Sequence, residues 1–365
     1  MHRITVLIMV LMTMIFCSST AQNSLVQAFK LSDQTLESAI EKNGIIGVNY
    51  AILINGKTVH QKSYGLAQIP LAVPLKITHR FPVASISKLF SSIALIHLLD
   101  THKISIQTPI GNVLQGNQIL PEKWKSIRIA SLLSHTSGIP DQIDYQIYLA
   151  PPSDEYVLQA LKEKAFDNPP RTKSKYNATG FLLVRLLIER LSGQSFENFM
   201  NSQYLKPSGL SSAVYGGFKK VLPDRVTCYQ TVADHLEMFP LNYSPVMYAG
   251  AGLNINLPDL CSWFEQLLAE KYVARSTLNN LWNPVLLNDG NAGNFGLGWE
   301  AKIIDESIRI NGHGGAGIAS IKHYWGKGLK QEITVIILTN GAKNWQLRPH
   351  QINAQIAQVL LENLP

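Results

Sequence analysis

The strongest chemical signal in this sequence is a hydroxyl and an amine three residues apart, in the stretch Ser85-Ile86-Ser87-Lys88. An apolar run follows as far as Leu99 without proline or glycine, which predicts a helix buried in the core. Because positions i and i+3 are neighbours on a helix, the Lys88 amine should lie beside the Ser85 hydroxyl. We expect Ser85 in the first turn, where unpaired N–H groups and the helix dipole favour negative charge. This arrangement suits a nucleophilic serine, although an N-capping serine followed by a solvated lysine has the same pattern.

Three other segments carry residue types that such a site needs. Residues 132–140 (LLSHTSGIP) place His135 where a predicted helix ends in a loop, and Tyr176 follows a proline turn. Residues 313–317 (HGGAG) precede a predicted strand, where glycines permit a ligand to approach the backbone and an N–H could stabilise an oxyanion. Taken alone, a C-cap, a structural histidine and a core tyrosine explain these residues equally well.

The hydrophobic pattern predicts an α+β fold. A helix is expected over residues 24–43, a hairpin over 47–54 and 57–66 around Asn55-Gly56, four strands over 299–304, 307–312, 318–325 and 331–339, and a last helix over 348–361. Residues 83–289 are expected to be mainly helical. The sequence therefore predicts one sheet region built from residues 22–82 and 290–365, with the helical region inserted between them.

Six motifs occur in the order seen in the serine β-lactamase-like family: residues 81–88 (FPVASISK), 132–140, Tyr176, 249–253 (AGAGL) with Asp259, 296–299 (GLGW) and 313–315. The chain resembles this family over nearly its whole length after residue 21. The family holds class C β-lactamases, D-alanyl-D-alanine carboxypeptidases, D-amino-acid amidases and β-lactamase-like esterases. The resemblance implies an antiparallel sheet flanked by helices, in the manner of penicillin-binding proteins, with the active site in the cleft between the sheet region and the helical region.

The resemblance also implies roles for individual residues. Ser85 would be the nucleophile, Lys88 its activating neighbour and Tyr176 the partner in proton transfer. The remaining roles concern the substrate: His313 and Gly315 would form the strand edge that holds it, and the backbone N–H groups of Ser85 and Ala316 would form the oxyanion hole. The expected activity is that of a serine hydrolase acting through an acyl-enzyme on an ester, an amide or a D-amino-acid peptide.

One departure from the family pattern affects the expected substrate. The family usually shows Tyr-x-Asn, whereas this chain has Ala178 in the third position and Asn177 in the second. Asn177 is the candidate for substrate binding, but an offset of one residue turns a helical side chain by about 100°. Loss of the usual amide contact would weaken amide recognition by roughly 1–3 kcal/mol. Simple esters or peptides are therefore expected rather than efficient β-lactam hydrolysis. The alternative is an inactive member that binds cell-envelope peptide, glycan or a protein partner.

The sequence leaves the identity of the general base open. Lys88 and Tyr176 both have ordinary pKa values near 10, and keeping either deprotonated at neutral pH costs about 4–5 kcal/mol. Burial beside a second cation can lower a lysine pKa by roughly 3–5 units. A phenolate beside a charged lysine would serve as well.

The N-terminus predicts export. Residues 1–21 combine Arg3, an apolar run and a small-x-small site, which is typical of a signal peptide and too short to span a bilayer. Cleavage near Ala21 is expected rather than lipidation at Cys17, because Phe16 is a poor residue before a lipidated cysteine. The mature chain would enter a bacterial periplasm or the medium, without stable membrane insertion. Its remaining cysteines, Cys228 and Cys261, form a disulfide or stay as two buried thiols.

Other function classes find little support in the sequence. An α/β-hydrolase needs a G-x-S-x-G elbow, which is absent, and the 10 histidines show neither H-x-H nor H-E-x-x-H spacing. No metal or other cofactor is therefore expected. The formal charge of +7 is dispersed and does not form the arginine-rich stripe typical of nucleic-acid binding. The expected partner is a small-molecule or peptide substrate, and the oligomeric state stays open.

Overall fold

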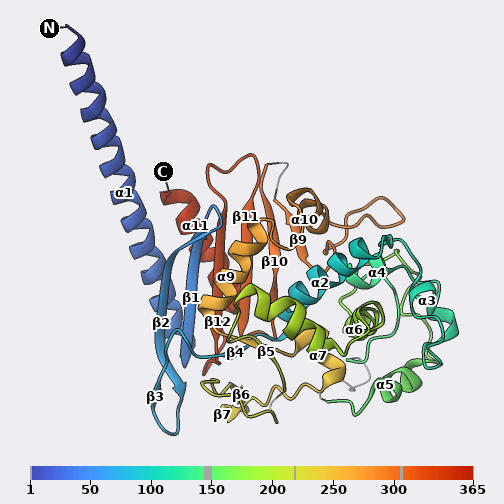
Figure 1. The fold of residues 1–365 in the computed structure, drawn as a ribbon. Helices are drawn as coiled ribbons and strands as arrows, with labels where there is room; N and C mark the ends of the chain where they lie inside the picture. Colours follow the sequence, from blue (N-terminus) through green and yellow to red (C-terminus); the bar gives the residue numbers. More distant parts are fainter. Residues whose placement is uncertain (1, 144–149, 218, 305–306, 365) are drawn as a thin grey trace.

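A seven-stranded antiparallel sheet forms the centre of the molecule (Figure 1). The computed structural model describes residues 2–143, 150–217, 219–304 and 307–364, and for residues 2–21 it describes the backbone only. The strand order is β3-β2-β1-β12-β11-β10-β9. The strands are β1 (Gly47–Ile54), β2 (Lys57–Gln68), β3 (Val73–Pro74), β9 (Glu300–Ile303), β10 (Arg309–Gly315), β11 (Ala319–Trp325) and β12 (Ile333–Thr339).

The two ends of the chain meet at the pair β1 and β12. The register places Val48 opposite Thr339, and β1 continues into β2 through the turn Asn55-Gly56. Both turn residues have positive φ, +49° and +72°, as a two-residue hairpin of this type requires. Every residue of β1 and β12 is buried, because helices cover both faces of the sheet.

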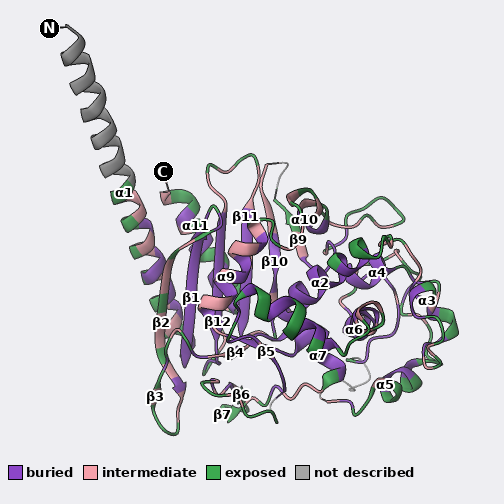
Figure 2. Cartoon of the chain, viewed as in Figure 1, coloured by how far each residue is buried: buried purple, intermediate pink, exposed green. Residues whose placement is uncertain are grey.

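Helices α1 (His2–Asn43) and α11 (Pro349–Asn363) pack together on one face of the sheet (Figures 1 and 2). Leu36 of α1 and Ile356 of α11 join Ile52 and Ile337 of the sheet in one buried cluster. These residues follow the helical period in the helices and the twofold period in the strands, so local pattern and packing agree. The cluster fixes the sheet from the side opposite to the helical region.

The other face carries the remaining helices. They are α2 (Ser87–Thr101), α3 (Ile110–Val113), α4 (Ile129–Leu133), α5 (Asp154–Leu161), α6 (Thr179–Ser192), α7 (Phe196–Phe199), α8 (Tyr248–Ala251), α9 (Leu257–Leu268) and α10 (Arg275–Trp282). Helix α2 lies at their centre and contacts α6 and α8. All of its residues except His97, Asp100 and Thr101 are buried, which confirms the prediction of a core helix.

Short elements that the hydrophobic pattern does not predict connect the helices. A three-stranded sheet consists of β4 (Phe81–Pro82), β8 (Leu253–Ile255) and β5 (Val214–Tyr215), and a hairpin consists of β6 (Tyr229–Val232) and β7 (His235–Met238). The tight 3₁₀ turns are η1 (Ala84–Ile86), η2 (Glu122–Trp124), η4 (Lys206–Ser208) and η5 (Pro245–Met247), and η3 (Met200–Leu205) is a short π-helix. Strands of two to four residues are too short to show a period, so only their partners define them.

The α+β class and the main strands agree with the sequence-based predictions. The large sheet takes its strands from residues 47–74 and 300–339, on either side of the mainly helical region. The boundaries at 82/83 and 289/290 stay predictions.

Several predictions concern the N-terminus and the cysteines. The signal peptide, Cys17 and Ala21 lie outside the residues whose side chains are described. Among the described residues, no helix has both the length and the apolar character needed to cross a bilayer. Cys228 and Cys261 are both buried free thiols, so the structure selects the second of the two alternatives given for them.

Candidate active site

Ser85 lies in the tight turn η1, immediately before helix α2. The expectation that it belongs to the first turn of that helix is therefore wrong by one element, because α2 begins at Ser87. Lys88 lies in the first turn of α2, and its Nζ still lies beside the Ser85 hydroxyl, at 3.2 Å. Ala84 has a φ of +45°, which is strained for a residue with a Cβ. The Ser87 hydroxyl holds this turn by donating to the Ala84 carbonyl at 2.6 Å.

Three functional groups from distant segments meet at this turn. The Ser85 Oγ lies 2.7 Å from the Tyr176 hydroxyl and 3.2 Å from the Lys88 Nζ, which donates to it. Lys88 also donates to the backbone carbonyl of Gly250 at 2.8 Å. Ser85 and Tyr176 are partly exposed, whereas Lys88 is buried. A nucleophile in contact with two proton carriers, and open to solvent on one side, is the geometry that acyl transfer needs.

The electrostatic surroundings give Lys88 and Tyr176 different protonation states. Burial lowers the pKa of the Lys88 amine to about 7, although the charge of Asp141 acts in the opposite direction. Burial raises the pKa of the Tyr176 phenol above its ordinary value, while the hydrogen bond with Ser85 acts against this. Near neutral pH a substantial share of Lys88 is therefore uncharged, and Tyr176 keeps its proton. Of the two bases that the sequence leaves open, the structure favours Lys88.

Aromatic rings enclose the Tyr176 side chain. The ring centroids of His135 and His313 lie 4.6 Å and 5.9 Å from that of Tyr176, and Phe295 lies at 6.0 Å. The Lys88 Nζ lies 4.9 Å from the Tyr176 ring centroid. This packing restricts the rotation of the phenol and keeps its hydroxyl directed at Ser85.

Asn177 does not face the substrate side of this arrangement. Its Nδ2 donates to the Ile139 carbonyl at 2.7 Å, and its Oδ1 accepts from the Gly180 N–H at 2.8 Å. Since both ends of the buried amide bind the backbone, Asn177 fixes the loop that carries Tyr176. The predicted role of Asn177 in substrate binding is not supported by this geometry. Ala178 is buried at the start of α6, where Asp141 accepts its N–H at 3.0 Å.

His135 has a larger part in the site than its sequence pattern indicated. Its Nδ1 accepts the N–H of Asn177 at 3.1 Å, which places the proton of the neutral ring on Nε2. Burial keeps the pKa of His135 well below its ordinary value, so the ring is neutral at pH 7. The Nε2 atom is buried and has no hydrogen-bond partner among the described residues. The only sequence signal for this role is the motif that contains it, because the contact with Asn177 depends on tertiary structure.

Strand β10 packs its predicted substrate edge against the turn that carries Ser85. A Cβ on Gly315 would lie 2.3 Å from the Val83 carbonyl oxygen, so only glycine permits this strand to pack against the turn before Ser85. Ala316 follows with a φ of +46° and is exposed. Among the hydrogen bonds of the described residues, none uses the backbone N–H of Ser85 or of Ala316. Their role in an oxyanion hole stays a prediction that this geometry permits.

His313 lies beside Tyr176 but is buried. Its Nδ1 lies 2.6 Å from the Gly314 carbonyl, so Nδ1 carries the proton, and burial lowers the pKa of the ring. Glu300 accepts the Gly314 N–H at 2.9 Å and pairs with Lys322, which fixes this part of the strand. Among the described residues, no group of three or more His, Cys, Asp or Glu side chains is placed to hold a metal ion.

A family model described as Beta-lactamase matches residues 32–358. The chain belongs to the β-lactamase family. It is 27% identical over 282 residues to a penicillin-binding protein of Bacillus subtilis (strain 168), a match that covers 71% of this chain and 60% of that relative. The chain therefore spans less than two thirds of the length of this curated relative.

Solved structures show the same fold. The octameric penicillin-binding protein homologue from Pyrococcus abyssi superposes with a TM-score of 0.76 at 20% identity, over 92% of this chain and 78% of that chain. The Beta-Lactamase/D-Alanine Carboxypeptidase from Pseudomonas syringae superposes with a TM-score of 0.73 at 16% identity, over 93% and 99%. At these identities the likeness establishes the α+β fold of β-lactamases and penicillin-binding proteins for this chain.

Proposed function

We propose that this protein is a serine hydrolase that forms a covalent acyl-enzyme on Ser85. The observation that carries the proposal is the contact of one hydroxyl with two proton carriers, at 3.2 Å from the Lys88 Nζ and 2.7 Å from the Tyr176 hydroxyl. Membership of the β-lactamase family and the lowered pKa of Lys88 support it. A base whose pKa lies near the working pH gives the most effective proton transfer.

In the acylation step, neutral Lys88 removes the proton of Ser85 as the Oγ attacks the substrate carbonyl carbon. The new C–O bond places negative charge on the carbonyl oxygen, which the N–H groups of Ser85 and Ala316 would stabilise. The bond to the leaving group then breaks. The proton held by Lys88 returns through the Tyr176 hydroxyl to the leaving oxygen or nitrogen, so both residues regain their starting states.

Deacylation repeats the sequence with water as the nucleophile. Lys88 removes a proton from a water molecule that attacks the ester carbonyl, and the bond between this carbon and the Ser85 Oγ breaks. The serine recovers its proton through Lys88 and Tyr176. The products are a free acid and the original alcohol or amine, with no oxidant, metal or cofactor consumed.

Ala178 favours simple esters as substrates. It disfavours amides that carry a second carbonyl, which the enzyme would have to bind through a hydrogen-bond donor at this position. An asparagine at position 178 could donate a hydrogen bond to such a carbonyl, whereas Ala178 has no side-chain donor. The Gly250 carbonyl, which binds Lys88 in this structure, cannot replace that donor because it can only accept. The missing donor would weaken binding of such substrates by roughly 1–3 kcal/mol. We therefore propose small esters as the preferred substrates, ahead of D-amino-acid peptides and β-lactams. Export to a periplasm or the medium, with removal of residues 1–21, belongs to the same proposal.

Labelling with a fluorophosphonate probe tests the nucleophile directly. Intact-protein and peptide mass spectrometry should show one adduct, located on Ser85, in the chain starting at residue 22. Ser85→Ala should abolish the adduct and reduce p-nitrophenyl ester hydrolysis by roughly 10³-fold or more. Ser174→Ala is the matched control, because this half-buried serine lies near Tyr176 in the sequence and its hydroxyl accepts the Asn294 N–H at 3.3 Å.

The outcome of the labelling also separates the enzyme from an inactive binder. Absence of any adduct between about pH 6 and pH 9 would contradict the proposal, because Lys88 passes through its neutral form in this range. That result would favour a family member that binds envelope peptide, glycan or a protein without turnover.

A further inference from the structure

The loop that follows helix α4 binds the backbone on both sides of Tyr176. The carbonyl oxygen of His135 accepts the N–H of Lys175 at 2.9 Å. The side chain of the same residue adds a second bond, because its Nδ1 accepts the N–H of Asn177 at 3.1 Å. One residue of this loop therefore holds the residue before Tyr176 and the residue after it.

The imidazole of His135 also packs against the phenol that lies between these two bonds. The two ring centroids are 4.6 Å apart, and the ring planes are tilted by 39°. The rings of Phe295 and Phe181 lie 4.5 Å and 5.5 Å from the imidazole, which is 1% exposed. Because the backbone and the ring of Tyr176 are both held, the phenol has little freedom to move away from the Ser85 Oγ.

The backbone of His135 has a left-handed conformation, with a φ of +56°. Residues with a Cβ rarely adopt such a φ, although histidine and asparagine do so more often than most. Strain of this kind persists only where the surrounding contacts maintain it, and it is concentrated at functional sites. In this conformation the carbonyl oxygen and the Nδ1 of one residue both bind the loop that carries Tyr176.

His135 has no direct bond to the reacting groups. Among the hydrogen bonds of the described residues, those of Ser85 and Lys88 go to each other, to Tyr176 and to Gly250, and none goes to His135. Since Nδ1 accepts a hydrogen bond, the neutral ring carries its proton on Nε2, which is buried and has no partner in the described part of the chain. Any effect of this residue on catalysis must therefore pass through Tyr176.

We propose that His135 is a positioning residue whose carbonyl oxygen and Nδ1 hold the peptide groups around Tyr176 and thereby keep its hydroxyl at the Ser85 Oγ. This inference rests on the proposed function, in which the Tyr176 hydroxyl returns the proton to the leaving group. A misplacement of about 1 Å can lower turnover by roughly 10²-fold. Loss of the Nδ1 acceptor should lower kcat much more than it changes KM, because Tyr176 acts after the substrate is bound.

Two polar variants separate the Nδ1 bond from the other properties of the side chain. Asparagine has an oxygen on Cγ, where histidine has Nδ1, so His135→Asn can still accept the N–H of Asn177 at a positive φ. The amide of glutamine lies one bond farther from the backbone, so His135→Gln loses this acceptor.

The measurement is kcat for a p-nitrophenyl ester, expressed per site that a fluorophosphonate probe labels. His135→Gln should lower kcat by roughly 10²-fold, whereas His135→Asn should stay within about tenfold of the unmodified protein. Equal kcat values for the two variants would contradict the proposal. A folded His135→Asn protein that loses roughly 10²-fold would contradict it as well, whether or not His135→Gln folds.

A double variant shows whether His135 acts through Tyr176. Once Tyr176→Phe has removed the hydroxyl, adding His135→Gln should lower kcat by less than about twofold further, because residues that act as a unit are not additive. A general disturbance of the fold would instead lower kcat by the same factor with and without the hydroxyl. That result would overturn the proposal.

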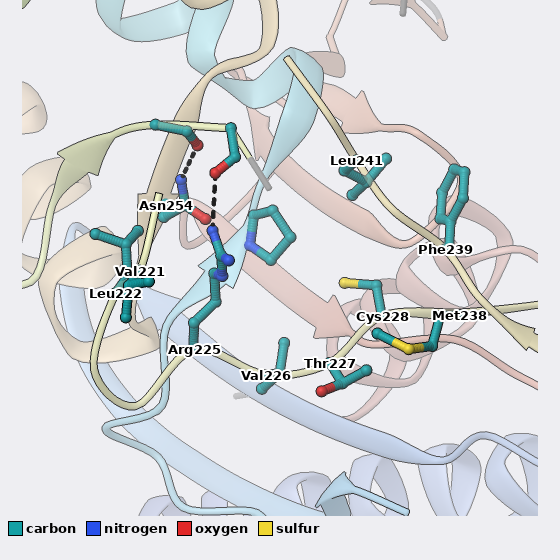
Figure 3. A pocket seen from close by; sticks show the side chains of 13 residues that line it. Val221, Leu222, Arg225, Val226, Thr227, Cys228, Met238, Phe239, Leu241 and Asn254 are labelled. Carbon is teal, nitrogen blue, oxygen red and sulfur yellow. Dashed lines mark hydrogen bonds between the residues drawn. The ribbon is translucent and has the colours of Figure 1, made fainter. Parts of the chain in front are cut away.

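Val226→Ala is the control for loss of stability. Val226 is buried and lines a separate cavity of about 220 Å³ together with Phe239 (Figure 3). Neither His135 nor Tyr176 lines this cavity. Removal of two buried methyl groups should lower the melting temperature, while kcat should stay within about twofold of the unmodified protein. If His135→Gln, at an equal loss of melting temperature, lowered kcat no more than Val226→Ala does, the positioning role would be wrong.

Crystal structures of the two variants test the inference without any turnover. In His135→Gln the Tyr176 hydroxyl should lie more than about 3.5 Å from the Ser85 Oγ, beyond hydrogen-bond distance. In His135→Asn it should stay near the 2.7 Å of the unmodified protein. An unchanged distance in His135→Gln would overturn the inference. An unmodified protein without activity would contradict only the proposed function, because these distances do not depend on turnover.

Discussion

The backbone carbonyl of Gly250 accepts a hydrogen bond of 2.8 Å from the Lys88 amine and fixes it beside Ser85. A carbonyl can accept from either an amine or an ammonium group, and it favours the charged form far less than a carboxylate in this place would. Burial therefore decides the protonation of Lys88. The site combines a fixed position for the Lys88 amine with a pKa close to neutral.

The first prediction concerns pH. Because only neutral Lys88 can remove a proton, kcat/KM for an ester should rise with pH and level off above a pKa near 7. The measurement is hydrolysis of a p-nitrophenyl ester under conditions where the free enzyme predominates. An activity that stays constant down to about pH 5 would show that Lys88 is not the base.

The second prediction concerns Tyr176. Tyr176→Phe removes the hydroxyl that lies 2.7 Å from Ser85 and should lower kcat by roughly 10²–10⁴-fold with little change in KM. The aromatic packing around the ring survives, so the melting temperature should stay close to that of the unmodified protein. Tyr64→Phe is the control, because this exposed hydroxyl binds Glu37 away from the site. Full activity of Tyr176→Phe would show that Tyr176 does not pass the proton to the leaving group and that Lys88 does so without it.

The third prediction compares two adjacent glycines of β10. A Cβ on Gly315 would meet the Val83 carbonyl at 2.3 Å, whereas a Cβ on Gly314 would meet nothing closer than 3.9 Å. Gly315→Ala should therefore displace the turn that carries Ser85 and abolish most fluorophosphonate labelling, whereas Gly314→Ala should retain it. Similar labelling of the two variants would contradict the close packing of β10 against this turn.

The fourth prediction concerns stability. Burial lowers the pKa of Lys88 in the folded protein below its value in the unfolded chain. Between about pH 7 and pH 10 the unfolded chain therefore binds more protons than the folded protein. The contribution of Lys88 to the free energy of unfolding thus rises with pH in this range. Lys88→Met removes the cost of the buried amine and should stabilise the inactive protein by about 1–2 kcal/mol at neutral pH. The gain should be larger at pH 6 than at pH 9. Urea unfolding of both proteins measures it, and a destabilised variant at pH 6 would contradict the account.

Local pattern is sufficient to select Ser85 and Lys88 as candidates and to predict the elements around them. The spacing of Ser85 and Lys88, the apolar run of α2 and the Asn55-Gly56 hairpin depend on residues that are close in sequence. The spacing of apolar residues predicts such features because neighbouring residues alone determine which side of a helix or strand each residue occupies. The order of the motifs extends this to the family and to the α+β fold.

Local sequence pattern does not predict contacts between residues that are far apart in the chain. Gly250 is 162 residues from Lys88 and binds it through a backbone carbonyl, which every residue has and no sequence pattern marks. Asn177 is a substrate candidate by its position after Tyr176, yet its amide is directed to the backbone of Ile139 and Gly180. The direction of a side chain, and the burial that sets the pKa of Lys88, depend on how separate elements pack. The sequence alone thus determined which groups could react, and tertiary packing decided their distances, their protonation and which of them meet at Ser85.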